Sequence, residues 1–521
     1  MALRARWPVA GLGLAGLTAA LATASVVAGL PGADAATRTS IGSTTAGATT
    51  GTVTVTGSGY GHGVGLSQYG ALGMARAGAT ATAILRHYYT GVDVAPVKDA
   101  VDVRVNVVDG GRSIVLRTRA VDAAGGAWRL LPDALPPLDL AAGDAVQVTP
   151  KDAGHLAVTV TRAAVPATSG PAPTTPGSAT PAAPPATPPA PPAPQHLVVA
   201  GLDVQWSGTR ARPGAATLLD VTSRTGGSSR RLRSYRWGQL HLTPVGSTVD
   251  AVAVLDLHAE YLRGIAEMPS SWPAAALQVQ AIAARNYALV AARTAPRAGC
   301  GGCQLWDDTR SQVYAGWTAE VPRWVAAVVA TQTSPSTALG VLYQGKPVTA
   351  YFASSTGGRT RDAVDVWGVP VPYLRSVDDR WSVDPSVNPG FARWTRPAGV
   401  PRLLSLFGLH DLASIAVTSR DAGGAARLVT ATAADGTSRT LSGNLLGSRL
   451  GLPGDWITSL ALPTLPSAPP ASPAPSSSPA PSSSPAPPSS PAPPSSPAPS
   501  PPPTGSPTAS PTASGTPMPV R

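Results

Sequence analysis

Two long proline-rich segments most constrain how this chain can fold. Of the 57 prolines in 521 residues, most lie in a Pro/Ala/Thr segment at 165–194 and a Pro/Ser/Ala/Thr segment at 463–521. Such compositions lack the large apolar side chains of a packed core and favour extended or disordered chain. We therefore expect a linker at 165–194, a disordered tail at 463–521, and folded regions at 36–164 and 195–462.

The N-terminus has the pattern of an export signal. Arg4 and Arg6 precede an apolar run over residues 7–30, and an A-x-A-like cleavage site ends at Ala35. We expect residues 1–35 to be a cleaved signal peptide, with an uncleaved membrane anchor as the alternative. A cleaved signal predicts a secreted or cell-wall protein with no membrane segment after processing.

The chain is basic, with 39 Lys and Arg against 28 Asp and Glu. Its densest basic cluster, Arg230, Arg231, Arg233 and Arg236, is short, and an exposed strand edge explains it as well as a nucleic-acid site would. We expect no nucleic-acid partner. A basic surface would instead attract anionic cell-wall polymers by weak electrostatic steering.

The second folded region is organised around residues 253–290. Apolar and small side chains recur at helical spacing over 254–268 and again over 274–290, and two prolines lie between the runs. Proline removes a backbone donor and restricts the residue before it. The pattern predicts two helices joined by an elbow, with Ser271 as the N-cap of the second.

Glu267 lies at this expected elbow and is one of only three glutamates in the chain. A carboxyl at a helix end, between Met268 and Trp272, would be poorly solvated, which raises its proton affinity. A general acid needs such a pKa near neutral pH. A solvated glutamate without a catalytic role is the alternative.

A glycine-rich stretch at 57–65 follows an alternating, strand-like sequence at 52–56. Its glycines allow unusual backbone angles and close approach of another chain. Their spacing excludes the G-x-G-x-x-G dinucleotide and G-x-x-x-x-G-K-[ST] phosphate motifs. We expect two short helices next, at 66–77 and 80–89, each ended by a glycine.

The remaining sequence predicts an α+β fold. Alternating runs over 100–163 indicate a small N-terminal antiparallel β module. After the elbow we expect a helix at 321–331, a hairpin turning near Gln344 and Gly345, and late strands between 414 and 442. The expected architecture is a helical elbow packed on antiparallel strands, with the small β module and long disordered Pro-rich segments.

Three motifs resemble the SpoIID/LytB family of bacterial cell-wall proteins, which includes glycan-strand lytic transglycosylases and amidase enhancers. They are YLRGIAEMPSSWPAAALQVQAIAARNYAL around Glu267, GYGHGVGLSQYGA within residues 57–91, and SSTGGRT at 354–360. In simpler members the glycine–histidine motif follows the glutamate motif, whereas here it precedes it. The resemblance therefore implies that the N-terminal block folds back onto the region of Glu267.

The resemblance also implies a function. Glu267 matches the catalytic acid/base of the lytic transglycosylases, which cleave peptidoglycan glycan strands with a single carboxyl. The substrate-binding residues that it implies are His62, Ser67, Gln68, Arg285, Tyr287, Ser354, Ser355 and Thr360. The alternative is a non-catalytic enhancer of a cell-wall amidase, or a wall-binding protein.

Other chemistry has weaker support. Asp307 and Asp308 would supply the second carboxylate of an ordinary glycoside hydrolase. A serine nucleophile lacks the G-x-S-x-G elbow, and no histidine and aspartate are obviously assigned to it.

Cys300 and Cys303 are the only cysteines. In an exported protein a short-loop disulfide is the first expectation, with a zinc site completed by a histidine as the alternative. Some family members carry a cysteine directly before Q-V-Y and are associated with zinc, but here that residue is Ser311. We therefore expect no cofactor.

Overall fold

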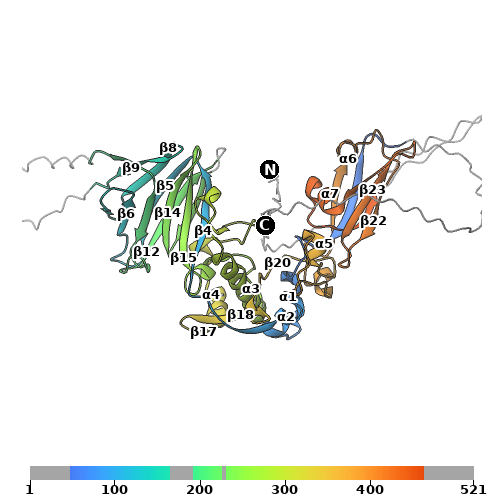
Figure 1. The fold of residues 1–521 in the computed structure, drawn as a ribbon, viewed down its shortest axis with the longest axis horizontal. Helices are drawn as coiled ribbons and strands as arrows, with labels where there is room; N and C mark the ends of the chain where they lie inside the picture. Colours follow the sequence, from blue (N-terminus) through green and yellow to red (C-terminus); the bar gives the residue numbers. More distant parts are fainter. Residues whose placement is uncertain (1–46, 165–191, 226–229, 463–521) are drawn as a thin grey trace, which may run out of the picture. The chain divides into compact units, whose positions relative to one another are not determined.

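The computed structural model describes residues 47–164, 192–225 and 230–462 (Figure 1). The expected signal peptide at 1–35, nearly all of the linker at 165–194 and the tail at 463–521 lie outside these residues. The α+β class is confirmed, because mostly antiparallel sheets are combined with helices. None of the helices in the described ranges is long and apolar enough to cross a membrane.

Two large sheets contain most of the strands. The seven-stranded sheet has the order β16-β4-β15-β14-β11-β6-β7, and the six-stranded sheet has the order β10-β9-β8-β5-β12-β13. The first comprises β4 (Asp102–Gly111), β6 (Trp128–Pro132), β7 (Leu138–Leu140), β11 (Leu202–Trp206), β14 (Gln239–Val245), β15 (Thr248–Asp256) and β16 (Leu305–Trp306). The second comprises β5 (Ser113–Ala120), β8 (Ala145–Asp152), β9 (His155–Thr161), β10 (Gln195–Val199), β12 (Thr217–Arg224) and β13 (Arg230–Tyr235).

Both sheets draw strands from both sides of residues 165–191. In the six-stranded sheet, β12 pairs with β5 along eight residues of each strand, from Thr217↔Ala120 to Arg224↔Ser113. The strands that were expected to form a separate small module at 100–163 are therefore built into sheets shared with the later region.

The prediction of a helix over residues 254–268, the first helix of the elbow, is wrong. Residues 248–256 form strand β15, and a short 3-10 helix, η1 (Tyr261–Gly264), follows it. β15 pairs with β14 and β4 and is buried on both faces. An apolar run buried on both faces loses the alternation of a surface strand, so its sequence resembles a buried helix.

The second helix of the elbow is present as α3 (Ala274–Ala292), although Pro273 rather than Ser271 occupies its N-cap position. Helix α3 contacts α4 (Pro322–Val329), α1 (Gln68–Arg76) and α2 (Ala81–Tyr88) (Figure 1). Twelve of its nineteen residues are buried, as expected for a helix covered on nearly every side.

The glycine-rich stretch packs against tryptophans. It leads out of β1 (Thr52–Ser58), which lies between β21 (Trp394–Gly399) and β25 (Trp456–Ala461). A Cβ at Gly63 would lie 2.1 Å from Cη2 of Trp456, and φ at Gly63 is +72°. The glycines thus bring the backbone close to another part of the same chain.

The other expected elements are largely confirmed. Helices α1 and α2 and the hairpin from β18 to β19 all form, and Gln344 and Gly345 have positive φ at its turn. The remaining elements are β2 (Leu66–Ser67), β3 (Asp93–Lys98), η2 (Ala298–Cys300), η3 (Gly316–Ala319), β17 (Gln332–Ser334), β18 (Thr337–Tyr343), β19 (Lys346–Pro347), β20 (Phe352–Ala353), α5 (Ala363–Trp367), η4 (Arg380–Val383), α6 (Val400–Phe407), β22 (Ser414–Arg420), β23 (Ala426–Thr432), β24 (Ser438–Ser442) and α7 (Gly443–Leu450).

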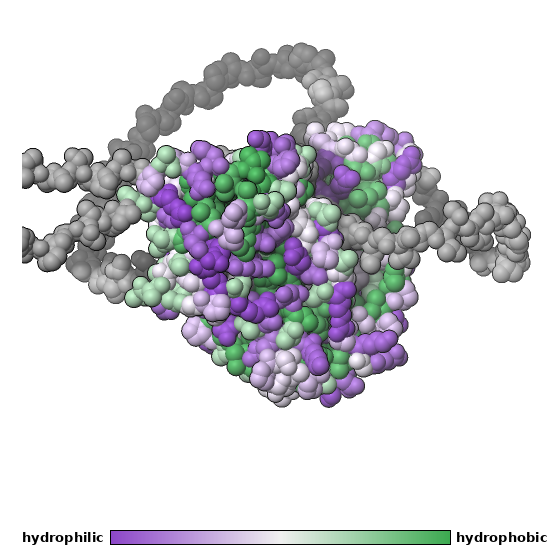
Figure 2. Space-filling view, turned by 60° about the vertical axis from the view of Figure 1, so that its left-hand side comes forward, coloured by the Kyte–Doolittle hydropathy of each residue, from purple (hydrophilic) through white to green (hydrophobic). Residues whose placement is uncertain are grey.

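Hydrophobic side chains on the face shown in Figure 2 form patches separated by hydrophilic ones. Scattered apolar residues of this kind are ordinary for a protein surface. A functional site therefore has to be located from specific contacts.

Candidate functional site around Glu267

Glu267 lies in the bend between η1 and α3, beside the loop that follows β16. The backbone N–H of Val313 in that loop donates a 2.5 Å hydrogen bond to Oε1 of Glu267. The carbonyl of Val313 accepts a 2.9 Å bond from the N–H of Ala266. The loop thus holds both the backbone and the carboxyl of this bend.

Gln68 joins the glycine–histidine motif to the bend. Its Nε2 donates to the backbone carbonyl of Glu267 and to Oε1 of Gln280 on α3, each at 3.2 Å. The preceding residue, Ser67, is the N-cap of α1 and accepts a hydrogen bond from the N–H of Gly70. The expectation that the N-terminal block folds back onto the Glu267 region is confirmed.

The carboxyl of Glu267 has an unusual proton affinity. Burial raises its pKa to about 7, although the hydrogen bonds from Val313 and Gln68 act in the opposite direction. Desolvation penalises the charged form, whereas donors to a carboxylate favour it. Near neutral pH the group therefore populates both the protonated and the ionised form.

Aromatic side chains gather near the bend. Tyr287 and Tyr351 have ring centroids 5.8 Å apart, and Tyr351 and Trp367 are 4.5 Å apart. The His62 ring lies 5.4 Å from that of Trp367, whose exposed fraction is 39%. We call Tyr287, Tyr351, Trp367 and His62 the aromatic cluster. A second pair, Tyr69 and Trp272, packs with centroids 5.2 Å apart.

Comparison with known proteins identifies the region that carries this site. The SpoIID family, described as Stage II sporulation protein, matches residues 246–336. This region of the chain belongs to the SpoIID family.

Three curated relatives match parts of the chain. An uncharacterized protein of Brachyspira hyodysenteriae is 34% identical over 143 residues, which cover 27% of this chain and 37% of that protein. The amidase enhancer of Bacillus subtilis is 33% identical over 123 residues, 23% of this chain and 15% of the enhancer. The stage II sporulation protein D of Bacillus amyloliquefaciens is 58% identical over 138 residues, 23% of this chain and 38% of that protein. The chain thus spans less than two fifths of each relative.

His62, which lies outside the matched residues 246–336, contacts Tyr351 and Trp367 in the aromatic cluster. Its Nδ1 accepts a 3.0 Å hydrogen bond from the N–H of Val64. Burial, and then the charge of Arg361, lower the pKa of His62 to about 4. The imidazole is therefore neutral at physiological pH and acts as an aromatic ring whose polar edge is held by backbone groups.

Several residues expected to bind substrate instead have internal partners. Nε of Arg285 donates to Asp99 at 2.8 Å, and both side chains are fully buried. The hydroxyl of Thr360, also buried, donates to the carbonyl of Arg375 and accepts from the N–H of Val377. These contacts are internal to the fold and leave neither side chain facing solvent.

The two serines of the SSTGGRT motif lie beside the glycine–histidine motif. The carbonyl of Ser354 accepts a 2.9 Å bond from the N–H of Tyr69, and Ser355 exchanges backbone hydrogen bonds with Tyr60. Ser354 is half-buried, whereas Ser355 is fully buried and its Oγ has no partner among the described residues. The motif thus supports the start of α1, next to Gln68.

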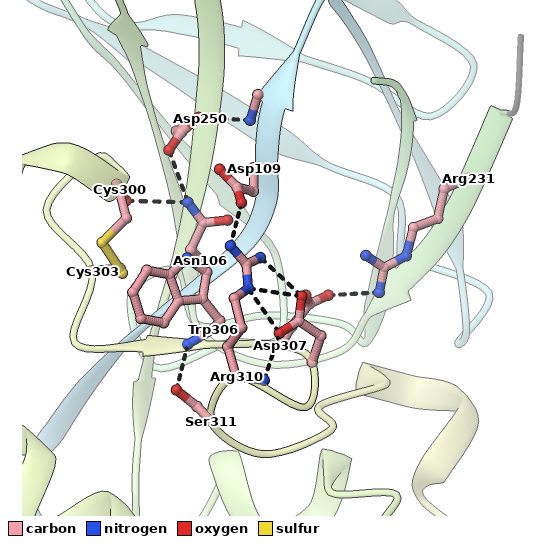
Figure 3. A network of polar contacts seen from close by, with 12 residues as sticks. Asn106, Asp109, Arg231, Asp250, Cys300, Cys303, Trp306, Asp307, Arg310 and Ser311 are labelled. Atoms are coloured by element: carbon pink, nitrogen blue, oxygen red, sulfur yellow. Dashed lines mark hydrogen bonds and ion pairs between the residues drawn. A yellow bond between two sulfur atoms is a disulfide. The ribbon is translucent and has the colours of Figure 1, made fainter. Parts of the chain in front are cut away.

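The two aspartates considered as a second carboxylate are held in ion pairs, and Figure 3 shows Asp307 beside Arg231. Asp307 pairs with Arg231 at 2.7 Å, and Asp308 pairs with Arg310 at 2.8 Å. Burial raises the pKa of Asp307 to about 6 against the effect of Arg231. Neither carboxylate has a hydrogen bond to Glu267 in the part of the chain that the structure describes.

Cys300 and Cys303 form a disulfide beside this network (Figure 3). The carbonyl of Cys300 accepts a 3.1 Å bond from Nδ2 of Asn106, which also donates to Asp250. The disulfide joins the two sulfur atoms that a zinc site at this position would need as ligands.

Sequence reasoning assigned no role at the site to four of its contributors. They are the N–H of Val313, the side chain of Gln280, and the rings of Tyr351 and Trp367. Val313 belongs to the Q-V-Y triplet and Tyr351 precedes the SSTGGRT motif, so their positions beside matched motifs were the available signal. Gln280 lies within the matched stretch around Glu267, and Trp367 belongs to a family pattern that follows the SSTGGRT motif, so the same kind of signal was available for both.

Proposed function

We propose that this chain acts on bacterial peptidoglycan as a lytic transglycosylase, with Glu267 as its single acid/base. The observation that carries the proposal is the partly buried Glu267 carboxyl, whose pKa of about 7 results from burial. Such a group can donate a proton and then take one back at the same pH. A cell-wall location accords with this substrate.

Proton transfer by one carboxyl accounts for the whole reaction. Protonated Glu267 donates to the glycosidic oxygen as the bond to C1 of N-acetylmuramic acid breaks. The C6 hydroxyl of the same sugar attacks C1, and its proton passes to the Glu267 carboxylate. The products are a 1,6-anhydro end and a new free end, the acid is regenerated, and no water is consumed.

Two features of the site support this cycle. The Val313 N–H donates directly to the carboxyl, so it would stabilise the carboxylate formed after the first transfer. The aromatic cluster offers apolar ring faces, with His62 neutral, and such faces suit the C–H face of a sugar ring.

The decisive experiment is mass spectrometry of purified glycan strands, with and without stem peptides, after incubation with the protein. We expect 1,6-anhydro ends that disappear with Glu267→Gln and persist with Glu320→Gln. Glu320 is a suitable control because it accepts a hydrogen bond from Nε1 of Trp237, which a glutamine can also accept. Reducing ends without anhydro product would instead show a hydrolase.

The second candidate function is enhancement of a cell-wall amidase without glycan cleavage. The similarity to the amidase enhancer of Bacillus subtilis favours it. Faster amidase turnover on intact wall, with unchanged glycan and no effect of Glu267→Gln, would select this function over the first.

A further inference from the structure

A buried carboxylate outside the matched motifs receives hydrogen bonds from three hydroxyls, one of which lies in the SSTGGRT motif. Asp379 precedes η4 and is fully buried. Its Oδ1 accepts from the hydroxyl of Tyr88 at 2.7 Å, and its Oδ2 accepts from Thr356 at 2.6 Å and from Ser382. Tyr88 ends α2, and Thr356 lies in the SSTGGRT motif.

The carboxylate fixes the direction of a hydrogen-bond chain. Burial raises the pKa of Asp379, and the hydrogen bonds that it accepts act in the opposite direction, in favour of the ionised form. An ionised carboxylate only accepts, so the hydroxyl of Ser382 donates to Asp379. The oxygen of Ser382 then accepts from the hydroxyl of Ser67, 2.8 Å away, and from the N–H of Thr356. The oxygen of Ser67 in turn accepts from the N–H of Gly70 in the first turn of α1. Every donor in this chain points toward Asp379.

The first turn of α1 also packs directly on the carboxylate. A Cβ at Gly70 would lie 2.0 Å from Oδ1 of Asp379 and 1.9 Å from the hydroxyl of Tyr88. The N-terminus of a helix carries partial positive charge, which a nearby anion stabilises. Contact, charge and hydrogen bonding therefore all hold this end of α1 at Asp379.

Gln68 is the first residue of α1 and contacts the backbone of Glu267. We propose that Asp379 is a positioning residue, which holds the start of α1 so that Gln68 stays against Glu267. The placement of Gln68 follows from the contacts alone, and only its catalytic consequence rests on the proposed function.

A readout at Glu267 separates positioning from a merely structural role. Hydrogen bonding by Gln68 lowers the pKa of Glu267, so release of Gln68 should raise it. Loss of stability alone would reduce the folded fraction without moving that pKa. Tyr261 and Tyr287 also face Glu267. Burial, and to a smaller extent the charge of Glu267, raises their pKa values above the ordinary tyrosine value, so neither titrates together with Glu267.

The pKa can be measured without any enzymatic activity. Glutamates labelled with 13C at the carboxyl give three signals, since the chain has only Glu260, Glu267 and Glu320, and Glu267→Gln assigns the one of interest. In the full chain we expect Asp379→Asn to raise the Glu267 pKa by the same amount as Gln68→Met. The double variant should show no further rise.

Asp378→Asn is the matched control, because the Asp378 carboxylate pairs with Arg380 on the surface and should leave the pKa unchanged. If Asp379→Asn does not fold, Ser382→Ala breaks the same chain and takes its place. A wild-type pKa in folded Asp379→Asn or Ser382→Ala, or a shift that adds to that of Gln68→Met, would overturn the proposal. If the wild-type chain proves inactive on glycan, the proposed function fails while this titration still decides the positioning.

Discussion

The side-chain amide of Gln68 donates a 3.2 Å hydrogen bond to the backbone carbonyl of Glu267, across 199 residues of sequence. The carboxyl of the same glutamate accepts from the N–H of Val313, 46 residues further along the chain. Three separate segments therefore meet at one ionisable group. Changes in any of them should be measurable through its proton affinity.

The first prediction concerns pH. Glu267 must be protonated to donate to the leaving oxygen, and its pKa is about 7. Because the acid form disappears above that pKa, kcat/KM for glycan cleavage should fall about tenfold per pH unit at alkaline pH. A pH–rate profile on purified glycan strands tests this. Activity that stays constant from pH 6 to pH 9 would contradict Glu267 as the general acid.

The second prediction concerns the aromatic cluster. Trp367→Ala removes the most exposed ring, so glycan binding should weaken by about tenfold, which corresponds to about 1.4 kcal/mol. Tryptophan fluorescence titration with glycan oligosaccharides measures the affinity. Trp317→Ala is the control, because Trp317 is similarly exposed, at 38%, and lies outside the cluster. Equal affinities for the wild type and Trp367→Ala would remove the cluster from the binding site.

The third prediction separates structural from substrate-binding arginine. Arg285→Met leaves the buried Asp99 carboxylate without its guanidinium partner, so the free energy of unfolding should fall by about 3–5 kcal/mol. Adding Asp99→Asn should restore part of the loss. Urea unfolding measures both. Unchanged stability together with weakened glycan binding would favour the substrate role instead.

The fourth prediction concerns the disulfide between Cys300 and Cys303. Replacing both cysteines by serine removes a short covalent loop and should lower the free energy of unfolding by about 2 kcal/mol. Wild-type protein unfolded in the presence of a reductant should show a similar loss. Equal stability of the variant and the oxidised wild type would show that the bond does not constrain the unfolded chain.

Local motifs were a more reliable guide to the segments that form the candidate site than to the secondary structure of those segments. The glycines that end them, Gly78 and Gly91, allowed helices α1 and α2 to be placed within two residues. The match around Glu267 located the site, and the permuted order of the motifs predicted the fold-back.

Long-range packing explains what the sequence could not reveal. Residues 248–256 are apolar because β15 is covered on both faces, and periodicity does not distinguish that burial from a core helix. Asp379 is flanked by ordinary polar residues, so its role depends entirely on hydroxyls contributed from α2, η4 and the SSTGGRT motif.

Both large sheets combine early and late strands, which has a consequence for biosynthesis. Strand β5 cannot complete its pairing until β12 has been synthesised. During synthesis, the first half of the chain therefore has unpaired strand edges. Such edges readily pair with other chains. For the same reason, a protease cut between 165 and 191 should leave two fragments that remain associated, and neither half should be soluble when expressed alone.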